Sequence, residues 1–151
     1  MRRVLFRSLL VLTTIVPLGT AAAVPAMAQP TVTAQFGQSA TLIAKGVGVQ
    51  VGVVYTCPAG SDASGFSMST SINERVSGGR IAQGTGSTSN TTGTGVIVCD
   101  ETAHTLPITV LAATGIAFRK GTALANGFFQ VCDANFSCTN VNFSAIIRIK
   151  R

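Results

Sequence analysis

Apolar and polar side chains alternate with a period of two in three segments of the chain. These segments are residues 47–57, 66–73 and 141–149. A period of two places one face of a strand on a core and the other in water, as in antiparallel sheets. Weaker candidates for strands are residues 40–45, 80–84, 95–99, 106–112 and 122–132. With frequent turns between them, the pattern predicts about seven to nine short strands.

Glycine-rich segments and polar turns separate these strands. Residues 84–95 have low sequence complexity and are expected to form a loop. Asn126-Gly127 is compatible with a two-residue hairpin turn or with a β-bulge in one long strand. The bulge is favoured, because the arms of the hairpin would each have only about four residues.

Composition supports the same fold class. From residue 29 onward the chain has 12 Val, 9 Ile and 16 Thr but only four Leu, two Glu and three Lys. Branched side chains suit a pleated sheet, whereas the scarce residues are the good helix formers. The sequence therefore predicts an all-β domain, an immunoglobulin-like antiparallel two-sheet sandwich that spans residues 29–151.

The N-terminus has the features of an export signal. Arg2, Arg3 and Arg7 precede an apolar stretch, and Ala26-Met27-Ala28 supplies small residues for signal peptidase. Residues 1–28 are thus expected to be a signal peptide that directs export of the chain by the general secretory or the twin-arginine route. Pro17 and Gly19 interrupt the apolar stretch, so cleavage is favoured over a membrane anchor. The expected location is secreted, with no membrane span after cleavage.

Four cysteines in an exported chain indicate disulfides. Cys132 and Cys138 bracket a short turn-like segment and are expected to close a local loop. That pairing leaves Cys57 with Cys99. Each of these two shares a face with apolar strand residues, so the second bond is expected to cross the core.

The charge balance argues against a nucleic-acid partner. The whole chain carries +6, but from residue 29 onward eight Lys and Arg face five Asp and Glu. Arg119-Lys120 is a small basic turn, and Arg148, Lys150 and Arg151 form a basic tail. Both are expected to be solvated, with adhesion to an anionic cell-wall polymer as the alternative.

The sequence lacks a recognisable catalytic set, and we expect no enzymatic activity. His104 is the only histidine and follows the acidic turn Asp100-Glu101. No Gly-x-Ser-x-Gly motif presents a nucleophile, and no second carboxylate is placed for acid–base catalysis. Glu74 has the inward parity of its strand, which suggests that the strand bends or ends there. No cofactor or metal site is expected.

Phenylalanine is concentrated in the C-terminal part of the chain. Phe128 and Phe129 are adjacent and point to opposite faces of a regular strand, and Phe136 lies between two cysteines. These three residues are candidates for a ligand or partner surface, against the alternative that they pack in the core or under a loop.

Several short segments resemble a group of small secreted actinobacterial immunoglobulin-like proteins that have no assigned activity. The segments are residues 55–58 (YTCP), 79–84 (GRIAQG), 98–100 (VCD) and 118–123 (FRKGTA). The resemblance implies a fold and a compartment rather than a reaction. A more distant similarity, through Cys132-x5-Cys138, is to the enediyne-binding apoproteins of the neocarzinostatin type.

The leading hypothesis is a secreted, non-catalytic module that makes an extracellular or cell-surface contact. One alternative is a carrier of a small hydrophobic ligand that uses Phe128 or Phe129. Another is a secreted enzyme inhibitor that displays residues 58–65. The expected partner is a protein, a cell-wall polymer or a small hydrophobic ligand, and the oligomeric state is left open.

Overall fold

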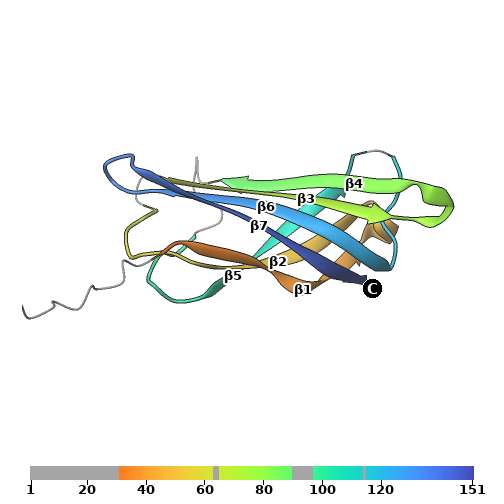
Figure 1. The fold of residues 1–151 in the computed structure, drawn as a ribbon, viewed down its shortest axis with the longest axis horizontal. Helices are drawn as coiled ribbons and strands as arrows, with labels where there is room; N and C mark the ends of the chain where they lie inside the picture. Colours follow the sequence, from red (N-terminus) through yellow and green to blue (C-terminus); the bar gives the residue numbers. More distant parts are fainter. Residues whose placement is uncertain (1–30, 63–64, 90–96, 114) are drawn as a thin grey trace, which may run out of the picture.

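Seven strands and two short 3-10 turns make up the described part of the chain. The computed structural model describes residues 31–62, 65–89, 97–113 and 115–151, so the predicted signal peptide lies outside it. The elements are β1 (Thr33–Ile43), η1 (Ala44–Gly46), β2 (Gly48–Thr56), β3 (Gly65–Arg75), η2 (Ser77–Gly79), β4 (Ile81–Ser89), β5 (His104–Ala112), β6 (Gly121–Cys132) and β7 (Cys138–Lys150) (Figure 1).

The strands form one closed barrel in the order β1-β2-β5-β4-β3-β6-β7. The prediction of an all-β fold is confirmed, but the prediction of an immunoglobulin-like two-sheet sandwich is wrong. Two seams close the barrel. β1 pairs with β7 in parallel over three residue pairs, and β4 pairs with β5 over two. Alternation along a strand is the same in a sandwich and in a barrel, so the sequence pattern does not distinguish them.

The alternating faces are placed as the sequence predicts. Val49, Val51 and Val53 of β2 are 0% exposed, and Met68 and Ile72 of β3 are also fully buried. These inward side chains fill the barrel, as expected for a barrel of this small strand number. The outward positions of the same strands are mostly Ser, Thr, Asn and Gln.

Two of the weaker predictions need correction. Residues 97–99, expected to belong to a strand, are not in a strand. Residues 84–89, expected to begin a loop, are part of β4, whereas residues 90–95 lie outside the described part. Ser and Thr have branched or small side chains that fit a pleated strand, so a low-complexity Ser/Thr/Gly segment is compatible with one.

Asn126-Gly127 lies inside one long strand. β6 is paired with β3 and with β7 through consecutive residues, without a shift in register at this point. The expectation of one strand is confirmed, whereas the β-bulge is wrong. Gly127 faces inward, like Ala125 and Phe129 two residues to either side. A bulge would break this alternation, so a bulge is not the reason for a glycine at this position.

Both disulfides join the expected cysteines. Cys57 bonds to Cys99, 42 positions away, and both residues are buried. Cys132 bonds to Cys138 and closes the β6–β7 hairpin at its last residue pair. The first bond ties the end of β2 to residues that precede β5, and the second holds a local turn.

Candidate binding face

The structure separates the three candidate phenylalanines. Phe129 is 0% exposed and lies inside the barrel, with its ring centroid 5.4 Å from that of Tyr55. Phe136 is 78% exposed, in the turn between Cys132 and Cys138. Phe128 is half-buried on the outside of β6. Of the adjacent pair, only Phe128 is therefore open to a ligand at the outer surface.

Phe128 lies in the centre of an uncharged surface, which we call the Phe128 face. The face consists of the outward residues in three rows across β4, β3, β6 and β7. The rows are Ser89, Ser67, Gln130 and Asn140; Ser87, Ser69, Phe128 and Asn142; and Thr85, Ser71, Asn126 and Ser144. Side chains directly opposite each other on neighbouring strands have Cβ atoms about 5 Å apart. Eleven hydroxyl or amide side chains thus surround one aromatic ring.

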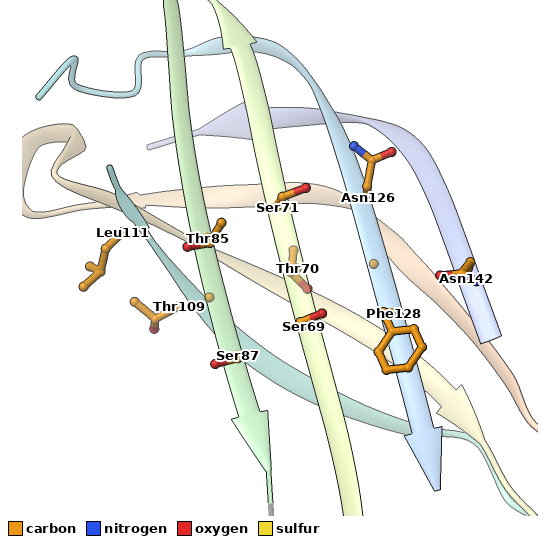
Figure 2. A pocket seen from close by; sticks show the side chains of 12 residues that line it. Ser69, Thr70, Ser71, Thr85, Ser87, Thr109, Leu111, Asn126, Phe128 and Asn142 are labelled. Carbon is orange, nitrogen blue, oxygen red and sulfur yellow. The ribbon is translucent and has the colours of Figure 1, made fainter. Parts of the chain in front are cut away.

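A hollow of about 610 Å³ lies over two of these rows and extends to β5. Figure 2 shows Phe128 on β6, with Asn142 on one side and Ser69 and Ser87 on the other. Thr109 and Leu111 of β5 line its far side. All of its lining residues are uncharged.

The amides at one edge of the face are held in place. Gln130 Nε2 donates a hydrogen bond to Asn140 Oδ1 at 2.9 Å. This bond uses one donor and one acceptor and leaves the other amide N–H and carbonyl lone pair free for a ligand. A fixed pair of amides loses less entropy on binding than two free side chains.

Beneath the face lies one unpaired hydroxyl. Thr70 Oγ1 is buried and has no hydrogen-bond partner within the described part of the chain. Its partners in the register are Gly86 on β4 and Gly127 on β6. Thr70 also lines the hollow, so it is a polar group close to the site. An unsatisfied buried hydroxyl costs about 1–3 kcal/mol.

His104, the first residue of β5, contacts the compact turn that precedes this strand and lies outside the Phe128 face. Asp100 Oδ1 lies 2.7 Å from His104 Nε2 and accepts hydrogen bonds from the Thr102 hydroxyl at 2.6 Å and the Thr102 N–H at 3.0 Å. The Thr102 hydroxyl and His104, as hydrogen-bond partners, lower the pKa of Asp100 to about 2. This arrangement stabilises the turn before β5.

The remaining candidates lie at the ends of the barrel. Residues 58–62 form turns in which the Ser61 hydroxyl donates to the Pro58 carbonyl at 2.7 Å, and residues 63–64 lie outside the described part. Arg119, Lys120 and the C-terminal cations are exposed. Glu74, whose inward parity suggested that its strand bends or ends there, is the second-last residue of β3 and is 2% exposed. Its role as a buried carboxylate at the end of the barrel was not expected.

Among the residues that the structure covers, no group of three or more His, Cys, Asp or Glu is placed to hold a metal ion. No described helix is long and apolar enough to cross a membrane. No protein-family model matches the chain, and no curated protein matches it.

Proposed function

We propose that this protein is a secreted, non-catalytic module that binds a neutral, hydroxyl-rich polymer on the Phe128 face, with a chain of neutral sugars as the ligand. The observation that carries the proposal is the central row of the face, where Phe128 lies between Ser69 and Asn142.

The chemistry of the face matches a sugar. Ser, Thr, Asn and Gln each donate and accept hydrogen bonds, which suits hydroxyl groups that do both. An aromatic ring carries partial negative charge on its face and attracts the C–H bonds of a pyranose ring. The absence of any charged residue from the three rows disfavours a charged ligand, whose burial would be uncompensated.

Secretion is part of the same proposal. Its support is the signal-like N-terminus together with two disulfides, which persist in oxidising compartments. A non-catalytic role is supported by the hydrogen bonds of His104 at the start of β5, whose Nε2 has Asp100 and the Thr102 hydroxyl as its partners.

The hypothesis of a hydrophobic-ligand carrier has weaker support. It needs a large apolar cavity, whereas Phe129, Met68 and the valines of β2 occupy the barrel interior. The hollow beside Phe128 lies on the outside of the barrel, and most of the residues that line it are Ser, Thr or Asn. The inhibitor hypothesis has no specific support from the residues at 58–62.

The experiment is affinity electrophoresis of the purified secreted protein in gels that contain β-glucan, mannan, xylan or glycol chitin. We expect retardation by at least one polymer, and about two- to tenfold weaker binding for Phe128→Ala, since an aromatic contact contributes about 0.5–1.5 kcal/mol. Leu124→Ala removes another exposed apolar side chain of β6 and is the matched control. Retardation by none of the four polymers, or equal loss in both variants, would contradict the proposal.

A further inference from the structure

The charges of the folded domain are separated along the barrel. Eight Lys and Arg residues follow residue 28, all of them exposed and all at or near one end. They are Lys45, Arg75, Arg80, Arg119, Lys120, Arg148, Lys150 and Arg151. Four of the five acids, Asp62, Asp100, Glu101 and Asp133, lie at the opposite end.

The strand pairing establishes which residues share an end. Ile43 pairs with Gly48, Arg75 with Ile81, and Gly121 with Ile149, so the connections beyond these pairs lie together. This basic end carries the C-terminus and the β3–β4 connection, on the right in Figure 1. The pairs Thr33–Thr56, Gly65–Cys132 and Cys132–Cys138 mark the acidic end.

Two loops of the basic end are locked together. The Phe118 N–H donates to the Gly46 carbonyl at 2.8 Å. Gly46 has a φ of +94°, and a side chain there would collide with the Phe118 carbonyl, so only glycine fits. Lys45 also has a positive φ, 56°. A non-glycine residue in this region is strained, which is common where a side chain is held for binding.

A buried carboxylate holds the same loop from the inside. Glu74 Oε2 accepts a hydrogen bond from the Arg119 N–H at 2.8 Å. Burial raises the pKa of Glu74, against the lowering effects of this bond and of the Arg119 charge. Because Glu74 is only 2% exposed, it fixes the loop backbone but offers no carboxylate at the surface.

The cations surround two adjoining hollows. One, of about 500 Å³, is lined by Leu42, Lys45, Phe118, Arg119, Lys120 and Arg151. The other, of about 440 Å³, is lined by Lys120, Gly121, Arg148, Ile149, Lys150 and Arg151. Lys120 and Arg151 line both, so the two hollows adjoin at these side chains, and we call the pair the basic track.

We propose that this basic end is a second binding site, separate from the Phe128 face, for a flexible linear polymer with repeating phosphate groups. Two hollows that share Lys120 and Arg151 suit successive anionic groups of one chain. Cations converge on each hollow from different elements, and a tetrahedral phosphate presents oxygens in several directions, whereas a carboxylate has two in one plane.

Two other polyanions fit the site less well. Binding of a single-stranded nucleic acid relies on aromatic rings that stack on bases. Phe118, the aromatic residue beside the basic track, is 2% exposed and offers no open face. An anionic membrane is flat and would contact the rim rather than the interior of the hollows.

The experiment measures binding of fluorescent inorganic polyphosphate to the full secreted protein by anisotropy, at several salt concentrations. We expect the logarithm of the binding constant to fall linearly with log salt, with a slope on the order of −2 to −4 for three to six phosphate contacts. The double variant Lys120→Ala/Arg151→Ala is expected to bind about thirtyfold more weakly, since each cation near an anionic surface contributes about 1 kcal/mol and the two together about 2 kcal/mol.

A matched control separates local contacts from net charge. Ala134→Glu/Asn135→Glu changes the net charge by the same two units in the exposed β6–β7 turn, at the acidic end. It should retain binding close to that of the parent protein at 0.15 M salt, where charges beyond about 8 Å are screened. Equal weakening in both double variants would overturn the proposal. Thermal melts of both variants verify that they are folded.

Other ligands identify the alternatives. Inorganic phosphate that binds as tightly as the polymer would overturn the assignment of a linear ligand. Tighter binding of polygalacturonate, of single-stranded DNA or of phosphatidylglycerol vesicles would each overturn the choice of a phosphate polymer. These binding measurements do not depend on whether the Phe128 face binds sugars, because both double variants leave the residues of that face unchanged.

Discussion

Gly127 of β6 lies directly opposite Phe143 of β7, and the Phe143 ring occupies the space that a side chain at residue 127 would need. The Phe143 ring also packs on Phe36 of β1, with centroids 4.7 Å apart. The glycine thus lets one ring bridge β6 and β1 inside the barrel, as aromatic residues elsewhere cover strand glycines.

Replacement of Gly127 by alanine should therefore destabilise the fold. The added methyl group displaces the Phe143 ring, and overpacking of this kind costs about 1–3 kcal/mol. Urea denaturation measures the change, with the exposed neighbour Asn126→Ala as control, expected to change stability by about 0.5 kcal/mol or less. A Gly127→Ala protein as stable as this control would show that the ring relocates freely.

Loss of the Cys57–Cys99 bond should be more costly than loss of Cys132–Cys138. On the chain-entropy estimate, the long loop contributes about 4 kcal/mol and the short one about 2.5 kcal/mol. Paired Cys→Ala variants, compared by urea denaturation, measure both values. The reverse order would mean that the unfolded chain is already compact around the longer loop.

The raised pKa of Glu74 predicts a loss of stability as the pH rises. The ordinary pKa is 4.5, and burial raises it in the folded protein, so the folded state holds its proton more tightly than the unfolded state. The free energy of unfolding should fall from pH 4.5 upward and level off above the raised pKa of Glu74.

Glu74→Gln should abolish this decline, because the amide cannot ionise. Glu101→Gln, in an exposed turn, is the control that should keep it. Urea denaturation between pH 4.5 and 7 compares the three proteins. A decline of equal size in Glu74→Gln would assign the pH dependence to another group.

Asp100 predicts the opposite behaviour at lower pH. Its pKa of about 2 lies below the ordinary value of 3.8, mainly through the Thr102 hydroxyl. Its contribution to stability should be complete above pH 3.8 and disappear as the pH falls through about 2.

Carbon-detected NMR of the Asp100 carboxyl group measures this pKa directly. Thr102→Ala should move the midpoint up toward 3.8, while the hydrogen bond from the residue 102 N–H remains. A midpoint near 3.8 in the parent protein would show that the turn does not hold these bonds in solution.

Individual strands could be predicted from the sequence where every second residue of the strand is apolar. The valines of β2 and the apolar residues of β7 predicted both strands and their inward faces. Barrel closure was not accessible, because it depends on two short seams. Pro107 of β5 is a partial indication in the sequence, because a proline has no N–H to donate and favours the edge of a sheet. β5 indeed pairs along its length with β2 but only through Leu111 and Ala112 with β4.

For the candidate sites, too, single residues could be predicted from the sequence but their neighbours on other strands could not. Phe128 was identified from its adjacency to Phe129, but its polar neighbours come from three other strands and depend on the register. The basic residues were seen as a separate turn and tail. Lys45, Arg75 and Arg80 lie at the same end of the barrel as these residues. This could not be predicted without the strand pairing, which determines which loops share an end.

Charges of opposite sign at the two ends make this molecule an electric dipole along its strands. β7, with 13 residues, is about 40 Å long, whereas ions screen a field within about 8 Å at physiological salt. A negatively charged surface would therefore orient the protein only when the two are within a few ångströms of each other, and the basic end would make the first contact. The barrel would then stand upright, with its uncharged flank turned sideways toward neighbouring molecules.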